Sequence, residues 1–155
     1  MATTHDATAL SQFKGTNAPT GFGSSAIVKL HVDMSVVPGQ LAATIDGSSS
    51  DVIQLWDIPI GCHIKCVLLD VTTAEGATAT VAIGDGDSTA GYLAATSINS
   101  AAKTATLITD AYGAVGGKLY AAADTLDLLF ATAADIDAAV FDVYVYCDFL
   151  QVYDA

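Results

Sequence analysis

A short segment of the chain contains three residues of the types that bind zinc, in the order Cys62-His63-Ile64-Lys65-Cys66. Zinc holds its sulfur ligands about 2.3 Å from the metal. In a strand, Cys62 and Cys66 would lie about 13 Å apart, because each residue adds about 3.3 Å. Haem attachment needs the order Cys-x-x-Cys-His, which is absent here. The spacing therefore predicts structural cysteines, with no metal and no cofactor bound.

The sequence Gly84-Asp85-Gly86-Asp87 resembles part of a calcium loop. An EF-hand needs further oxygen ligands at set spacings and a glutamate that binds with both oxygens. The single glutamate of the chain, Glu75, belongs to a different turn. We therefore expect a Gly/Asp hairpin turn. A weak cation site shared between subunits stays open as the alternative.

Four carboxylates lie between two expected strands: Asp124, Asp127, Asp135 and Asp137. A pair of carboxylates can act as general acid and base in glycoside hydrolysis. Alternation places Asp127 on the same strand face as Thr125, which predicts a solvated face rather than an active site.

No nucleophile and acid accompany the histidines, which are His5, His31 and His63. The nucleophile-elbow, zinc-protease and P-loop patterns are also absent. We predict no catalytic residues and no enzyme activity, and a hydrolase based on the four carboxylates is a distant alternative.

Five aromatic residues are candidates for contacts with another chain: Phe13, Phe22, Trp56, Tyr144 and Tyr146. Alternation puts Trp56 on the same strand face as Gln54. Trp56 could therefore lie at the edge of the core or in an interface, and the sequence favours neither. The two tyrosines share the aspartate-bearing face of the last strand, a face that is either wet or packed against another chain.

The sequence pattern predicts that these residues lie on strands. Apolar and polar residues alternate over 28–34 and again over 139–153, as expected when one face of a strand is buried. Roughly eight short strands separated by turn residues predict an all-β fold, a β-sandwich with a jelly roll as one version. We expect residues 26–155 to form this single domain. Only the structure of 94–102 is left open.

Residues 1–25 are rich in Thr, Ala, Gly and Ser. Pro19 and Gly21 make a helix unfavourable there. This segment is either a partly disordered terminus or an extended N-terminal arm whose Phe13 and Phe22 dock on a neighbouring subunit.

The composition excludes several classes of partner. Hydrophobic residues make up 52% of the chain and charged residues 14%, with 17 acidic residues, five lysines and no arginine, for a net charge of −12. Such a chain is a poor ligand for nucleic acid and for anionic membranes. We find no signal peptide and no apolar run of membrane-spanning length. An odd number of cysteines, three, fits a reducing cytoplasm as the place of synthesis.

Two-thirds of the chain resembles small structural proteins of tailed phages, the capsid decoration (cement) or head structural proteins. The resemblance is carried by the succession of five segments: Ile53–Gly61, Val71–Gly76, Ile83–Asp87, Gly91–Leu93 and Tyr120–Leu128.

The resemblance implies a virion protein, made in the host cytoplasm, that sits on the outer capsid surface. It implies binding across major capsid protein subunits, often as a homotrimer, and stabilisation of the shell. It transfers no catalytic residue, and residues 1–25 fall outside it. The alternative function is a head-fibre or carbohydrate-binding host-attachment module, for which Trp56, Tyr144 and Tyr146 would be the stacking aromatics.

Overall fold

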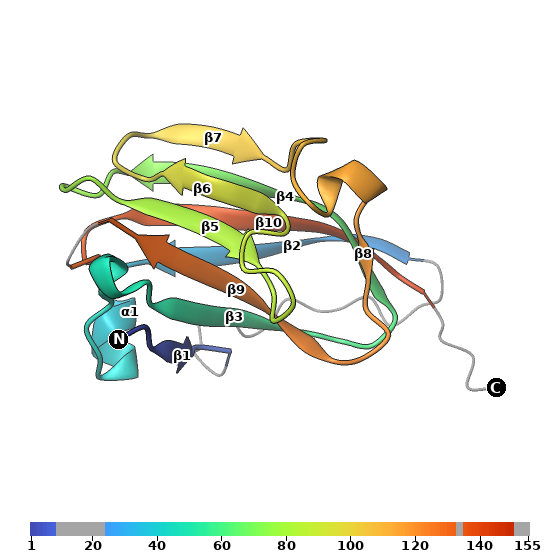
Figure 1. The fold of residues 1–155 in the computed structure, drawn as a ribbon, viewed down its shortest axis with the longest axis horizontal. Coiled ribbons are helices and arrows are strands. Elements are labelled where there is room, and N and C mark those ends of the chain that lie inside the picture. The colour runs from blue at the N-terminus through green and yellow to red at the C-terminus, as the bar shows by residue number, and fades with distance from the viewer. Residues whose placement is uncertain (9–23, 133–134, 151–155) are drawn as a thin grey trace.

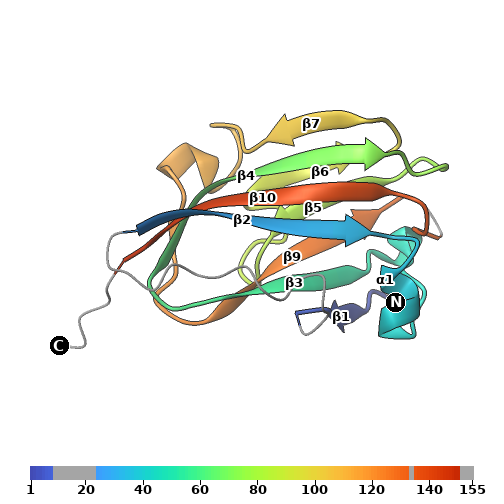
Figure 2. The same ribbon diagram turned by 180° about the vertical axis from the view of Figure 1, so that it is seen from behind.

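The computed structural model describes residues 1–8, 24–132 and 135–150. They form two β-sheets packed face to face (Figure 1), which confirms the predicted all-β sandwich. The first sheet has the order β1-β3-β9-β5-β6, and its strands span Thr4–Asp6, Val52–Ile58, Asp124–Ala131, Thr80–Gly84 and Leu93–Ser97. The second sheet, which faces the viewer in Figure 2, has the order β2-β10-β4-β7, with strands Ser24–Asp33, Val140–Phe149, Cys62–Thr73 and Ala102–Ala105. The short strand β8, Lys118–Leu119, also pairs with β4.

The strand pairs are nested in the sequence. The pair β2/β10 encloses β3/β9, which encloses β4/β7, which encloses β5/β6, and all four pairs are antiparallel. Successive pairs alternate between the two sheets. This nesting is the topology of a jelly roll, the version of the sandwich that the sequence left open. Strands β1 and β8 are additions to its eight strands.

Strand β1 belongs to the sandwich rather than to a separate arm. It pairs in parallel with β3, and Ala7, directly after it, is fully buried. The carboxylate of Asp51 holds this strand, because it accepts a hydrogen bond of 2.8 Å from the backbone N–H of Thr3. The predicted arm therefore does not include 3–7. Residues 9–23, with Phe13 and Phe22, lie outside the described residues, so the division at residue 26 stays a prediction for them.

The core lies between the sheets, and β10 shows how the sequence builds it. Its inward residues Phe141, Val143 and Val145 have no exposed surface. The long apolar run Cys62–Thr73, without Gly or Pro, predicts a strand whose centre, Ile64–Val71, is covered on both faces. The strand β4 has these bounds, but its centre is not fully covered on the outer face. Its inward residues Ile64 and Val67 are buried, whereas the outward-facing Lys65 is exposed.

A β-bulge in β3 reverses the predicted faces of its second half. Gln54 pairs with Asp127, and the next pair is Trp56 with Leu126, so Leu55 is the extra residue. A bulge shifts the alternation by one residue. Leu55 and Trp56 are consequently both buried, and Asp57 is exposed. The expectation that Trp56 shares a face with Gln54 is therefore wrong.

The stretch 94–102 is extended rather than helical: it holds most of β6, a turn and the start of β7. The described helices are short, namely α1 (Val37–Leu41) and the 3₁₀ turns η1 (Gly47–Ser49) and η2 (Gly113–Val115). None of the helices in the described parts of the chain has the length and apolarity to span a membrane.

Candidate functional site

Charged groups from both sheets meet at one end of the sandwich. Lys118 begins β8, which is attached to the second sheet, whereas Asp85 follows β5 and Asp124 begins β9 in the first sheet. The Lys118 ammonium lies 2.8 Å from Oδ2 of Asp85, 2.8 Å from Oδ2 of Asp87 and 3.9 Å from Oδ2 of Asp124. We call Lys118 with these three carboxylates the lysine clamp.

The sequence around Asp85 folds into a tight polar turn, as predicted. Its Oδ1 accepts backbone N–H groups from Asp87 at 3.0 Å and Ser88 at 2.9 Å. Gly84 is required here, because a side chain on it would lie 1.9 Å from the carbonyl oxygen of Ser88. The turn therefore fixes the Asp85 carboxylate, which is fully buried, in one direction.

Three tyrosines surround the buried carboxylate. Tyr120 donates a hydrogen bond of 2.6 Å to Oδ2 of Asp85, and Tyr112 donates one of 2.8 Å to Oδ1. The hydroxyl of Tyr92 lies 2.9 Å from that of Tyr120. The rings of Tyr92 and Tyr112 meet edge to face at 4.8 Å. Both oxygens of Asp85 are thus satisfied by donors, as a buried carboxylate requires.

The electrostatics of the clamp follow from these contacts. Burial opposes ionisation of Asp85, but the hydrogen bonds from Lys118, Tyr120 and Tyr112 outweigh it and hold its pKa below the usual value. Burial also opposes the charge of Lys118, yet its bonds to Asp85 and Asp87 raise the pKa of its ammonium. Burial and the neighbouring Asp85 raise the pKa of Tyr112 to about 12. Near neutral pH, Lys118 and Asp85 are therefore both charged, and the three tyrosines around Asp85 are neutral.

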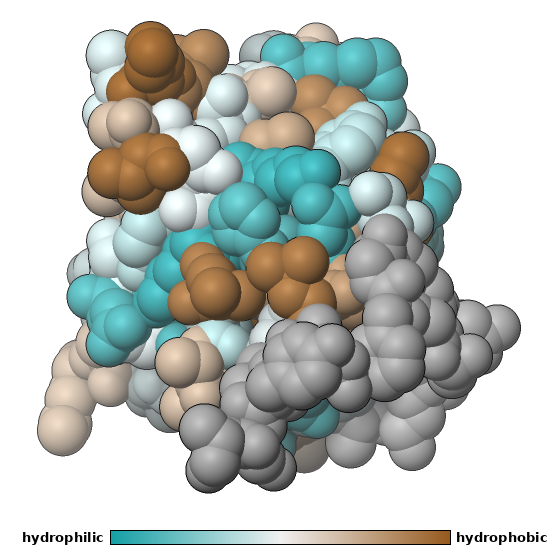
Figure 3. Space-filling view, turned by 90° about the vertical axis from the view of Figure 1, so that its right-hand side faces the viewer, coloured by the Kyte–Doolittle hydropathy of each residue, from teal (hydrophilic) through white to brown (hydrophobic). Residues whose placement is uncertain are grey.

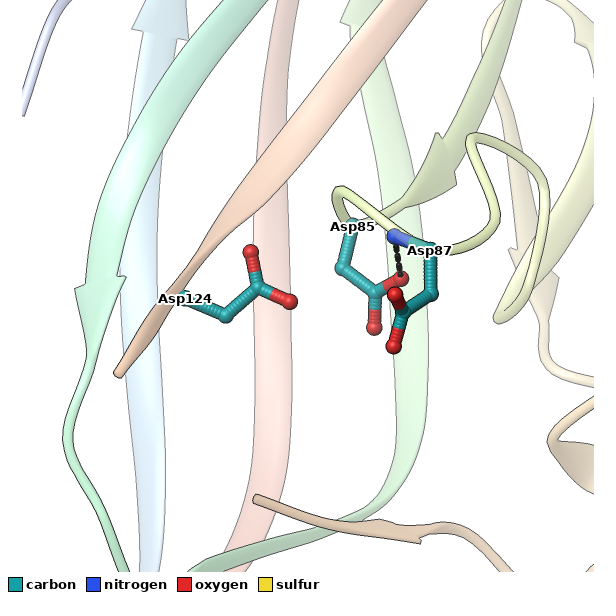
Figure 4. A group of neighbouring side chains, drawn as sticks. All are labelled: Asp85, Asp87 and Asp124. Carbon is teal, nitrogen blue, oxygen red and sulfur yellow. Dashed lines mark hydrogen bonds between the residues drawn. The ribbon is translucent and has the colours of Figure 1, made fainter. Parts of the chain in front are cut away.

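The clamp bears on the open question of a cation site. Figure 4 shows Asp124 facing Asp85 and Asp87, and oxygens of the three carboxylates lie within 4.8 Å of one another. This spacing would suit a divalent ion with oxygen ligands. The Lys118 ammonium, however, already contacts all three carboxylates and supplies the positive charge. The clamp thus ties the two sheets together through ion pairs, and a shared cation site at these carboxylates stays a prediction.

Sequence reasoning missed Lys118. A usable signal was the scarcity of lysine: with 17 acidic residues and five lysines, every lysine has many candidate partners. The four lysines of the described residues are all ion-paired: Lys29, Lys65, Lys103 and Lys118.

The four carboxylates considered for glycoside hydrolysis do not form one site. Asp124 belongs to the clamp, while Asp135 and Asp137 are exposed in the turn before β10. Asp127 is 6% exposed, so the prediction of a solvated Asp127 is wrong. It accepts a hydrogen bond of 2.7 Å from Thr125, and burial raises its pKa. Asp127 lies in the middle of the first sheet, between β3 and β5, and these neighbours cover it.

The tyrosines of β10 lie on the outer face of the second sheet. Tyr144 and Tyr146 are half-buried, and Tyr144 lies under the ammonium of Lys29 at 5.5 Å. Lys29 also pairs with Asp142 at 2.8 Å. Beside Tyr146 and the exposed Ile27 lies an open hollow of about 390 Å³. This face combines ion pairs with exposed apolar surface.

The aromatics do not gather on one surface. Trp56 is 9% exposed and belongs to the core between the sheets, whereas Tyr144 and Tyr146 face outward from the second sheet. The position of Trp56 fits the core-edge alternative, and contacts of these residues with another chain stay predictions. The three rings cannot stack on one sugar without a rearrangement of the fold.

The cysteines have a structural environment. Cys62 and Cys147 are buried in the core, Cys66 is half-buried, and none of them forms a disulfide. The contact with Cys147 and burial raise the pKa of the Cys62 thiol, so it is not a reactive thiolate.

Comparisons of the sequence with known proteins identify no relative. No protein-family model matches it. No curated protein matches it either.

The fold does have solved counterparts. A chain in the capsid of Ralstonia phage GP4 aligns with a TM-score of 0.60 and 12% identity, over 96% of this chain and 99% of that chain. A chain of the cyanophage Pam1 capsid asymmetric unit aligns with a TM-score of 0.55 and 17% identity, over 94% and 99%. A chain of the acid-stable capsid of Helicobacter pylori bacteriophage KHP30 gives a TM-score of 0.56 and 13% identity, over 84% and 92%. The jelly roll described above is thus a fold found, at low sequence identity, in the capsids of three phages.

Proposed function

We propose that this chain is a virion structural protein of a phage, a capsid decoration protein that binds across major capsid protein subunits and stabilises the shell. One observation carries the proposal: the match to the Ralstonia phage GP4 capsid covers nearly the whole of both chains. The similarity therefore concerns a complete small domain of the same size, not a piece shared with a larger protein.

The charge of the chain supports a place on the outer surface. A net charge of −12 without arginine would be repelled by packaged DNA. Outside the shell, the same charge keeps the virion soluble and draws the protein to basic patches on the major capsid protein. An acidic jelly roll is therefore better suited to the outer face of a shell than to its lining.

The protein would stabilise the shell by holding neighbouring capsid subunits together. A standard interface between proteins buries about 1,600 Å² in total, and each copy that bridges two capsid subunits opposes their separation. Several copies held together, a trimer by preference, would multiply weak contacts through avidity. The segment 9–23, with Phe13 and Phe22, is a candidate for extending this contact.

The lysine clamp supports a structural rather than an enzymatic role. Lys118 pairs with its carboxylates, and tyrosines donate hydrogen bonds to Asp85, so these groups serve to hold the fold. The alternative of a host-attachment module has less support, because Trp56 is in the core and apart from Tyr144 and Tyr146.

The test uses shells of the source phage prepared without this protein. Purified full-length chain is added, and bound protein is located by electron microscopy. We expect density at regular positions on the outside, and a rise in the temperature at which the particles release DNA. Density lining the interior, a shell built from this chain alone, or no binding at any lattice position would overturn the proposal. A glycan array tests the alternative function, a host-attachment module, because only such a module should bind glycans.

A further inference from the structure

The part of the chain that contains the edge strands β6 and β7 carries almost no charge. Between residues 88 and 117, which we call the β6–β7 side, the sequence contains one lysine and one acidic residue, Lys103 and Asp110. Lys103 is paired with Asp70, and Asp110 is 8% exposed. The net charge of −12 is therefore carried wholly by the rest of the chain.

The β6–β7 side also contains two open sheet edges. β6 ends the first sheet and β7 ends the second, and both lie along the same side in Figures 1 and 2. Their exposed side chains include Ala94, Ala95, Ala102 and Ala105. Natural edge strands are commonly protected by charges, as the edge strand β2 is by Lys29. The edges of the β6–β7 side have only the paired Lys103, so they are suited to being covered.

Large hydrophobic side chains stand out from the end of this side. Leu107 is 58% exposed, Ile108 82% and Val115 75%. Figure 3 looks at the end of the molecule that carries the loop after β7, and it shows separate groups of hydrophobic side chains with hydrophilic ones between them. Three such residues within a short loop are more than the scattered exposure of single apolar residues.

The loop that carries them is internally braced. Asp110 accepts a hydrogen bond of 2.5 Å from the backbone N–H of Leu107, and its own N–H donates to the Leu107 carbonyl at 3.0 Å. Tyr112 N–H donates to the Gly91 carbonyl at 2.8 Å, which ties the loop to the residue before Tyr92. A side chain on Gly113 would lie 1.9 Å from the Leu107 carbonyl oxygen, so the chain is closely packed there. The hydrophobic residues are thus presented in a fixed arrangement, which lowers the entropy lost on binding.

We propose that copies of this chain bind one another through the β6–β7 side. Two copies with a charge of −12 each repel wherever their acidic surfaces approach within a Debye length, about 8 Å at physiological salt. The β6–β7 side adds little to that repulsion, and it offers the exposed Leu107, Ile108 and Val115 for apolar contact. A basic partner would instead be drawn to the acidic remainder of the surface. The inference rests on the proposed assembly of several copies and names the surface through which they meet.

The experiment is sedimentation velocity on the purified full-length chain. We expect the wild type to sediment as an oligomer, and its dissociation constant to decrease when salt is raised, because salt screens the repulsion. Ile108→Asp should weaken association at least 10-fold. The matched control is Ile27→Asp, which charges another exposed hydrophobic residue, 61% exposed, on the outer face of the second sheet. Its sedimentation should equal that of the wild type.

A second variant guards against loss of fold in the first. Ala95→Asp adds a charge to the exposed edge of β6, and it should weaken association in the same way while circular dichroism stays unchanged. A wild type that is monomeric at millimolar concentration overturns the inference. So does association that survives both β6–β7 variants, or that is lost only in Ile27→Asp.

Shell binding distinguishes failure of the inference from failure of the proposed function. A monomer that binds shells would leave the decoration role standing and remove the surface proposed here. An oligomer that depends on Ile108 but binds no shell would support the β6–β7 side as the contact surface and remove the decoration role.

Discussion

The ammonium group of Lys118 lies 2.8 Å from Oδ2 of Asp85, a residue with no exposed surface. The two residues come from different sheets, since β8 pairs with β4 and Asp85 follows β5. Strand pairing holds each sheet together, whereas contacts of this kind hold one sheet to the other. The stability of the sandwich should therefore depend on Lys118 more than on any other lysine of the described residues.

Replacing Lys118 with Met keeps the length of the side chain and removes its charge. The Asp85 carboxylate would then stay buried without its counter-ion, and breaking a buried ion pair costs about 3 kcal/mol. For a domain of this size that corresponds to a fall in melting temperature of about 6–12 °C. The matched control is Lys103→Met, since Lys103 is 66% exposed in its pair with Asp70 and its loss should lower the melting temperature far less. Equal losses in the two variants would contradict the role assigned to the clamp.

The clamp also predicts how stability depends on pH. The pKa of Asp85 is lower in the folded chain than its usual value of 3.8, so its contribution to stability is present above that value and is lost as the pH falls through the folded pKa. The pKa of Lys118 is raised above its usual value of 10.5, so its contribution to stability is present below that value and is lost as the pH rises through the folded pKa. Thermal melts from pH 2 to 12 should show both losses in the wild type, and the alkaline loss should be smaller in Lys118→Met.

Calcium should not stabilise the wild-type protein. Lys118 contacts the three carboxylates that could hold the ion, and a divalent cation would have to displace it. In Lys118→Ala the same carboxylates face one another without that charge, and added calcium should raise the melting temperature of this variant. Melting curves with and without 5 mM calcium, with magnesium as comparison, measure both effects. A rise in the wild type would show that the ion competes successfully with the lysine.

The contribution of Asp127 to stability should depend on pH in the opposite direction to that of Asp85. Burial raises its pKa, so ionisation of this carboxyl weakens folding as the pH increases. Asp127→Asn removes that cost and keeps an acceptor for the Thr125 hydroxyl. The variant should melt above the wild type at pH 7, and the advantage should shrink towards pH 3.

The control for this substitution is Asp142→Asn. Burial opposes ionisation of Asp142 too, but hydrogen bonds with Lys29 and His31 outweigh it and hold its pKa below the usual value. Removing this charge should therefore lower the melting temperature at pH 7. A gain in both variants would mean that the net negative charge, rather than the local environment, sets the effect.

Asp51 should control the attachment of β1. It accepts hydrogen bonds from the N–H groups of Thr3 and Asp46, at 2.8 and 2.9 Å, and it is 4% exposed. Asp51→Ala leaves both donors without this partner and should release β1 from β3. Hydrogen exchange of residues 4–6 should become faster by at least 10-fold, while β10 stays protected. Asp57→Ala, at an exposed position of β3, is the matched control and should leave the exchange of β1 unchanged.

The regular parts of the fold were readable from the sequence because alternation is a local signal. The strand containing Phe141, Val143 and Val145 has the predicted buried face, and the strand Cys62–Thr73 has the predicted bounds. The nesting of the pairs was not readable, since it depends on contacts between residues far apart in the chain. The jelly roll could therefore be offered only as one version of a sandwich.

The errors at Trp56 and Asp127 have physical causes outside the local pattern. A bulge shifts alternation without a marker in the sequence, because Leu55 is an ordinary strand residue. Asp127 is covered by neighbouring strands rather than by its own sequence neighbours. Lys118 and Asp85 are likewise far apart in sequence, so nothing local linked the lysine to the predicted Gly/Asp turn.

The bulge at Leu55 has a practical consequence. By turning the single tryptophan inward, it gives the protein one intrinsic fluorophore, located between the two sheets. The emission of Trp56 should move to longer wavelength when water reaches the space between the sheets, and no label is needed to follow this. Opening of the sandwich by pressure, acid or force can thus be recorded from one native residue, in the free protein and on a particle whose other proteins lack tryptophan.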